Sequence, residues 1–162
     1  MDFKRLILFV LLGMTASCQT DTLVDQTISM PEHGWLQKNK VEIPFEIGDT
    51  TKSYDLHVAI RQSNEYPYYN LYFIPKIMNS DGFVIKRTFA EAFFYDSKTG
   101  KPKGTGLGDM YSHQYVIFKH IRFTRLGKYK ISLEQFMRTD TLKGIVSAGA
   151  SITETPANDG KN

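Results

Sequence analysis

The sequence predicts an all-β fold, a single antiparallel β-sandwich of about seven or eight strands. Apolar and polar residues alternate over most of the chain, as they do in strands that bury one face. Turn signals rich in Gly, Asn and Asp separate these alternating segments. No long segment has the apolar spacing of an amphipathic helix. The 11 Phe and 9 Tyr residues offer aromatic packing for a core that has no disulfide.

The predicted strands follow one another in chain order. They span residues 41–47, 54–61, 70–78, 83–95, 115–123, 129–135 and 145–153, and 83–95 is read as one or two strands. Pro44 places the first of them at a sheet edge or a bulge, and Gly149 suggests a bulge in the last. Tight turns are expected at 79–82, which ends in Asp-Gly, and at 126–127. The segment 89–94 (FAEAFF) is also compatible with a helical turn.

The N-terminus has the pattern of an export signal. Lys4 and Arg5 precede an apolar run at 6–14, and small residues lead to Cys18, the one cysteine of the chain. The run is shorter than the roughly 20 residues of a membrane-spanning helix. We therefore predict a lipoprotein signal peptide at 1–17 and lipid attachment at Cys18, which would tether the protein to a membrane. The alternative is an ordinary signal peptide with an incidental cysteine.

The remaining chain divides into three parts on composition. A polar lipidated tether is expected at 18–32, the β-sandwich domain at 33–154 and a disordered tail at 155–162. The whole chain carries 20 basic and 17 acidic residues, with no long basic run. This balance gives no support for nucleic acid as a partner.

The chain offers little that points to catalysis. The Gly-rich segment 100–109 lacks the Gly-Lys-Ser/Thr of a phosphate-binding loop, so a structural loop or bulged hairpin is favoured, with Asp109 capping its own backbone amides. The four histidines follow no metal-binding spacing. We predict no enzyme activity, no catalytic residue, no cofactor, no metal and no small-molecule ligand. A hydrolase of unrecognised type remains an alternative, and it would require convergent Ser, His and Asp side chains.

The tyrosine-rich segment 66–72 is the best candidate for binding. Tyr66, Tyr68 and Tyr72 on one flat sheet face would favour a glycan-binding surface lipoprotein. The other interpretation is a turn and strand that line the core, with Pro67 stiffening the turn. Arg138, which follows a predicted strand, is expected to satisfy loop carbonyls or a buried carboxylate.

Several short motifs occur in a fixed order along the chain. They are Trp35, Tyr66-Pro67, Asn70-Leu71-Tyr72, Gly104-Thr105-Gly106-Leu107-Gly108-Asp109, Leu126-Gly127-Lys128-Tyr129, Glu134-Gln135-Phe136-Met137-Arg138 and Leu142-Lys143-Gly144-Ile145. In this order and spacing the chain resembles the gliding-motility lipoprotein H (GldH-like) family of the Bacteroidetes. The candidate interaction or family-motif residues are Tyr66, Pro67, Asn70, Tyr72, Gly106, Gly108, Asp109, Gln135, Met137 and Arg138.

The resemblance implies a non-enzymatic accessory protein of the gliding machinery and the associated type IX secretion route. Such a protein would be held by lipid at the outer membrane, on the periplasmic face. It would act through contacts with other envelope or gliding-machinery proteins.

Overall fold

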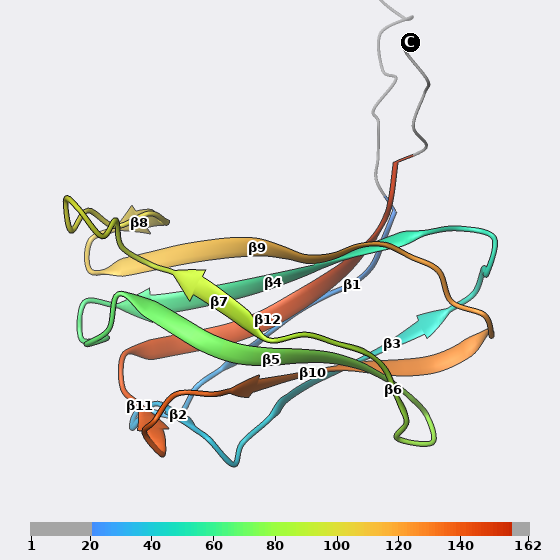
Figure 1. Cartoon of the computed structure of the whole chain (residues 1–162), viewed down its shortest axis with the longest axis horizontal. Helices are drawn as coiled ribbons and strands as arrows, with labels where there is room; N and C mark the ends of the chain where they lie inside the picture. The colour runs from blue at the N-terminus through green and yellow to red at the C-terminus, as the bar shows by residue number, and fades with distance from the viewer. Residues whose placement is uncertain (1–20, 157–162) are drawn as a thin grey trace, which may run out of the picture.

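The computed structural model describes residues 21–156, and this part of the chain is built from β-strands and their connections (Figure 1). The strands are β1 (Thr22–Ser29), β2 (Trp35–Leu36), β3 (Val41–Ile47), β4 (Tyr54–Ser63), β5 (Asn70–Asn79), β6 (Val84–Arg87), β7 (Ala90–Phe93), β8 (Thr105–Leu107), β9 (Met110–Ile121), β10 (Gly127–Gln135), β11 (Thr141–Leu142) and β12 (Ile145–Glu154).

Two sheets pack face to face, so the predicted all-β sandwich is confirmed (Figure 1). One sheet has the strand order β1-β12-β4-β9-β8, and the other has the order β3-β10-β5-β6, with β7 also paired to β5. The short strands β2 and β11 form a separate two-stranded ribbon. All strand pairs are antiparallel.

The core lies between the two sheets and follows from the alternation in the sequence. On β3, Val41, Ile43, Phe45 and Ile47 are buried, whereas the residues between them are exposed. β4 alternates in the same way and buries Leu56, Val58 and Ile60 against them. Burial of one such side chain contributes about 1.5–3 kcal/mol. β3 pairs with β10 alone and is therefore an edge strand, as the position of Pro44 predicted.

The N-terminal boundary of the domain differs from the prediction. Residues Thr22–Ser29 form β1, which pairs with β12 along its whole length, so the tether predicted at 18–32 is wrong from Thr22 onward. An irregularity between Thr22 and Val24 shifts the register and interrupts the alternation from which strands are predicted. The predicted signal peptide and Cys18 lie outside the described residues. Thr155, predicted to open the disordered tail, bonds to Ser53 and Asp55.

The segment 83–95, predicted as one or two strands, contains β6 and β7, and the alternative of a helical turn at 89–94 is excluded. One local prediction is corrected. Gly149 pairs in regular register on both sides and is not a bulge. Its role is to let β1 approach, because a Cβ at Gly149 would lie 2.5 Å from the carbonyl oxygen of Gln26. The irregularity of β12 lies instead between Ile145 and Ser147.

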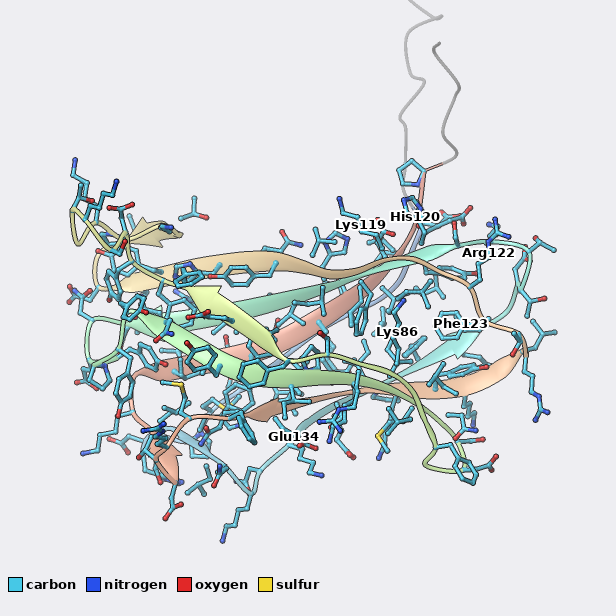
Figure 2. The ribbon with its side chains drawn as sticks, in the orientation of Figure 1. Lys86, Lys119, His120, Arg122, Phe123 and Glu134 are labelled. Carbon is cyan, nitrogen blue, oxygen red and sulfur yellow. The ribbon has the colours of Figure 1, made fainter. Side chains whose placement is uncertain are left out.

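The sandwich has two distinct ends. At the N-terminal end, β1 begins at Thr22, and loops 48–53 and 122–126 cross between the sheets. The aromatic rings that close the core here come from Phe45, Tyr54, Phe123 and Tyr129. Figure 2 shows Phe123 between the sheets. The loop 64–69, the segment 136–144 and the β2–β11 ribbon lie at the opposite end (Figure 1).

Candidate functional site

The segment 89–93 places its large side chains outside and its small ones inside. Ala92 on β7 is fully buried and Ala90 is partly buried. Phe89 and Phe93, in contrast, are 56% and 40% exposed. A strand that directs alanines to the core and phenylalanines to solvent reverses the usual distribution. Exposed apolar surface of this kind is typical of an interaction site.

These phenylalanines contact the half-buried Tyr72 on β5 and two exposed rings, Tyr69 before β5 and Phe136 after β10. Tyr72 stacks on Phe89, with ring centroids 5.3 Å apart, and Phe136 meets Phe89 edge-on at 5.7 Å. Tyr69 lies 6.0 Å from Phe93. Pairing of Tyr72 with Glu91 and of Asn70 with Phe93 joins both groups on one face of the sheet. We call Tyr69, Tyr72, Phe89, Phe93 and Phe136 the aromatic patch.

Polar groups lie within the aromatic patch. The side-chain amide of Asn70 donates a hydrogen bond of 2.6 Å to the carboxylate of Glu91. That carboxylate also raises the pKa of the neighbouring Tyr72 phenol through a hydrogen bond. Lys103 places its ammonium 5.7 Å from the centre of the Phe93 ring. Aromatic rings together with a few oriented polar groups are the composition of a protein interface core.

The segment 135–139 holds one side of the aromatic patch in place. The buried Gln135 donates from Nε2 to the carbonyl of Thr139 and accepts at Oε1 from the backbone N–H of Met137. The Met137 sulfur in turn accepts the N–H of Tyr72 at 3.3 Å. Phe136 N–H bonds to the Tyr72 carbonyl at 2.8 Å. The turn therefore fixes the exposed Phe136 ring against β5.

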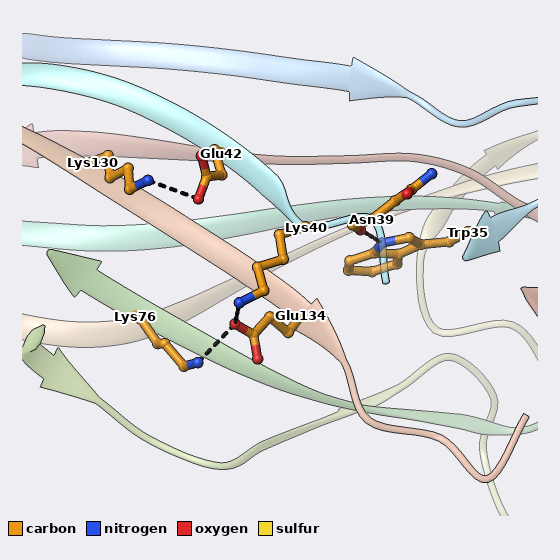
Figure 3. A network of polar contacts seen from close by, with 7 residues as sticks. All are labelled: Trp35, Asn39, Lys40, Glu42, Lys76, Lys130 and Glu134. Atoms are coloured by element: carbon orange, nitrogen blue, oxygen red, sulfur yellow. Dashed lines mark hydrogen bonds and ion pairs between the residues drawn. The ribbon is translucent and has the colours of Figure 1, made fainter. Parts of the chain in front are cut away.

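The same face of this sheet also carries a set of ion pairs, which Figure 3 shows. Glu134 accepts from both Lys40 at 2.8 Å and Lys76 at 2.7 Å. Lys130 pairs with Glu42 at 2.8 Å. Burial raises the pKa of Glu134, but the hydrogen bonds from the two lysines outweigh it and hold that pKa below its ordinary value. The charged side chains of this part of the face are thus paired with one another, whereas no other part of residues 21–156 covers Phe89, Phe93 and Phe136 of the aromatic patch.

Tyr66 is a core residue, which removes the predicted glycan-binding surface of three tyrosines. Only 3% of Tyr66 is exposed, and its hydroxyl donates to the carbonyl of Asn70 at 2.8 Å. Burial raises the pKa of this phenol above its ordinary value. Tyr68 packs edge-on against Tyr66 from the loop, and Tyr72 alone of the three stands on the sheet face. The core-lining interpretation is correct for Tyr66.

The Gly-rich segment forms a structural hairpin, as its favoured interpretation predicted. β8 pairs with the start of β9 across a two-residue turn at Gly108-Asp109, where Gly108 has φ +64°. Gly104 leaves room for the buried His113, whose Nε2 would lie 2.8 Å from a Cβ at that position. Asp109 does not cap its own backbone. It accepts hydrogen bonds from the amide side chain and the N–H of Asn64.

The structure brings only some of the predicted site residues together. Asn70, Tyr72, Gln135 and Met137 build or support the aromatic patch. The exposed Pro67 lies in the loop before it, and the exposed Gly106, Gly108 and Asp109 lie on the hairpin. Gln135, not Arg138, satisfies the loop carbonyl of Thr139. Arg138 is exposed and makes no ion pair with any residue of 21–156.

Phe89, Glu91, Phe93 and Phe136 were missed by the sequence analysis. Phe89, Glu91 and Phe93 share a spacing of two, which places them on one face of the strand predicted within 83–95, but this spacing does not show whether that face is buried or exposed. Among residues 21–156, no three His, Cys, Asp or Glu side chains gather in a way that would hold a metal ion. Within the same range, no helix is long and apolar enough to cross a membrane.

Fold and surface together define a β-sandwich that carries a patch of aromatic side chains on one sheet face. Residues 22–152 match the GldH lipoprotein family, and the chain belongs to this family. It is 30% identical to the gliding motility lipoprotein GldH homolog of Christiangramia forsetii over 94% of this chain and 96% of that protein. It is 27% identical to the gliding motility lipoprotein GldH of Flavobacterium johnsoniae over 85% of this chain and 88% of that protein.

Two solved structures show a distant likeness. A chain in the structure of infectious bursal disease virus, Gx strain, aligns over 87% of this chain and 33% of its own length, at 13% identity and a TM-score of 0.41. The coat protein of Tobacco streak virus aligns with a TM-score of 0.28. These scores carry no functional argument.

Proposed function

We propose that this chain is an accessory lipoprotein of the gliding-motility machinery and its associated type IX secretion route. It acts without catalysis, through protein contacts made by the aromatic patch. Lipid on Cys18 holds it at the outer membrane, on the periplasmic face. The observation that carries this proposal is the family membership, since the relatives named as gliding motility lipoproteins align over nearly their full length.

The aromatic patch supplies the means of contact. Large rings held by β5, β7 and the turn after β10 lose little conformational freedom when a partner covers them. Tyr and Phe are enriched at the centres of protein interfaces, where they fill pockets on the partner. Glu91 and Asn70 add an oriented acceptor and donor among the rings. A protein partner with a complementary apolar pocket fits this composition.

Gene replacement in a gliding host tests the proposal. Deletion should abolish colony spreading, and the wild-type gene should restore it. A Phe89→Ser, Phe136→Ser variant should be made at normal levels and fail to restore spreading, because both rings are exposed and support little of the core. Leu107→Ser is the matched control, since Leu107 is 91% exposed and lies on β8, which contributes no ring to the aromatic patch.

The anchor is tested separately. Cys18→Ala should leave the protein soluble after signal cleavage, whereas the wild type stays with the outer membrane on fractionation. Normal spreading of the deletion strain would contradict the role in gliding. A Cys18→Ala protein that stays membrane-bound after its signal peptide has been removed would contradict the lipid anchor.

A further inference from the structure

The start of β1 lies close to the proposed lipid. Four residue steps separate Cys18 from Thr22, and an extended chain spans at most about 14 Å over four steps. Thr22 is already paired with Thr153 of β12. If Cys18 carries the lipid, as the proposed function holds, the bilayer surface must therefore lie within this distance of Thr22. The predicted long tether would have allowed any orientation, but a chain of this length does not.

The hydrogen-bonding register shows which residues of the neighbouring strands lie beside Thr22. Thr22 pairs with Thr153, Thr153 pairs with Asp55, and the Asp55 carboxylate accepts the N–H of His120 at 2.8 Å. These residues form a row across the sheet, about 15 Å wide at the usual strand spacing. Because β9 runs antiparallel to β1, the loop 122–126 lies beyond this row, on the side from which the chain reaches Thr22.

Basic side chains border this side of the row. Figure 2 shows Lys119, His120 and Arg122 along the edge beside the start of β1. Lys119, Arg122 and Arg125 are exposed, and none of them forms an ion pair within residues 21–156. Leu126 follows them and is 64% exposed. Cations next to a protruding apolar side chain suit an anionic lipid surface.

The acidic groups at this end are mostly occupied. Asp55 accepts from His120 and from the Thr155 hydroxyl, and Glu154 pairs with Lys52 at 2.6 Å. The Asp49 carboxylate accepts from the N–H and hydroxyl of Thr51. The donors to Asp49 and Asp55 are neutral, so both carboxylates keep their negative charge, as does the exposed Asp21. No carboxylate of residues 21–156 forms an ion pair with Lys119, Arg122 or Arg125, so these cations remain free to contact another surface.

The loop 122–126 is held rigidly. Phe123 is buried among Phe45, Tyr54 and Tyr129. The Tyr129 hydroxyl donates to the carbonyl of Arg125 at 2.8 Å. With Phe123 pointing inward, its exposed neighbours Arg122, Arg125 and Leu126 are presented outward without a change of backbone.

We propose that Lys119 and the loop 122–126 form the face on which the anchored protein rests on anionic phospholipid headgroups. The other orientation within reach of the anchor would lay the β1 edge on the membrane. That edge exposes Asp25 with Gln26 and Thr27, and Asp25 would be repelled by the same headgroups. Resting on the loop directs the opposite end of the sandwich, and with it the aromatic patch, away from the bilayer.

Nitroxide labelling of single cysteines tests this orientation. Acylated Cys18 takes no label, so Leu126→Cys or Leu107→Cys provides one reactive thiol in the lipidated protein. The protein is placed in vesicles of phosphatidylethanolamine and phosphatidylglycerol, and collisions of each nitroxide with oxygen and with a water-soluble nickel chelate are compared. The collision ratio at position 126 should shift toward oxygen, as in the headgroup region. Position 107 should give the ratio of bulk water.

Two further arms make the result decisive. Arg122→Gln, Arg125→Gln, or vesicles of phosphatidylcholine alone, should move the ratio at 126 back toward that at 107. Equal, water-like ratios at both positions in anchored protein would overturn the proposed orientation and leave the anchor intact. Labelling of the wild-type thiol would instead show that Cys18 is free, which would contradict the anchor itself and remove the basis of the orientation.

Discussion

The ring of Tyr72 stacks on the ring of Phe89 at 5.3 Å, and the backbone N–H of the same Tyr72 bonds to the sulfur of Met137. One residue thus links the exposed aromatic patch to the turn formed by Gln135 and Met137. The turn formed by Gln135 and Met137 therefore also fixes the position of the aromatic patch.

The glycine after β11 gives the first prediction. Gly144 and Gly82 both have positive φ, +77° and +85°, so alanine carries a similar backbone cost of about 1 kcal/mol at either position. A Cβ at Gly82 meets nothing within 4 Å, whereas one at Gly144 clashes with the backbone of Tyr66. Gly144→Ala should therefore lower the free energy of unfolding by about 1–3 kcal/mol more than Gly82→Ala. Urea denaturation measures both, and equal losses would show that the contact is relieved easily.

The ion pairs on the outer sheet face give a second matched pair. Glu134→Gln removes a carboxylate that is 19% exposed and shared by two lysines, and it should cost about 1 kcal/mol or more at neutral pH. Glu42→Gln removes a pair in which the carboxylate is 46% exposed, and its cost should be smaller. Chemical denaturation in low salt measures this difference.

The pH dependence of the same variants tests the lowered pKa of Glu134. Because that pKa lies below 4.5 in the folded state, the carboxylate stabilises the fold above pH 4.5 and loses this effect as the pH falls through the folded value. Wild-type stability should therefore decline more steeply below pH 4.5 than that of Glu134→Gln. Parallel curves of stability against pH would show that the ion pairs of Glu134 with the two lysines do not stabilise the fold.

His113 should make stability sensitive to mild acid. Burial lowers its pKa from the ordinary 6.5, and its Nε2 has no hydrogen-bond partner among the described residues. The unfolded chain then binds a proton more readily than the folded one, so stability should fall as the pH drops below 6.5. His113→Phe should reduce this fall, since a neutral ring can still pack on Phe94. Thermal unfolding between mildly acid and neutral pH checks the slope, and an unchanged slope would exclude His113 as its source.

Sequence alone predicted the strands in which buried and exposed residues alternate regularly. β3 and β4 alternate without interruption, so their inward residues followed from the pattern, as did the bounds of β3 and the start of β4. β4 runs to Ser63, two residues beyond its predicted end. β1 was missed because it is an edge strand with few buried side chains and an irregularity after Thr22. Residues 22–29 were therefore wrongly assigned to the tether. Because they form β1, the segment between Cys18 and the domain is short, which limits how an anchored molecule can be oriented.

The aromatic patch was beyond sequence reasoning for a different reason. Phe89, Phe93 and Phe94 are chemically alike, and the sequence does not show that Phe94 is fully buried while the other two are exposed. Only the pairing of β7 with β5 assigns the two faces. Tyr66 is the reverse case. Its hydroxyl suggested a binding group, but within the core it donates a hydrogen bond to the carbonyl of Asn70.

Crosslinking at Phe89 tests the central claim most directly. A photoreactive phenylalanine analogue at position 89, expressed in a gliding host, should give a light-dependent adduct with another protein of the gliding machinery in intact cells. The same analogue at position 107 should give none, and Cys18→Ala should weaken the adduct at 89 by releasing the protein from the membrane. Absence of any adduct at 89 and at 136, in protein that is folded and anchored at normal levels, would contradict the account.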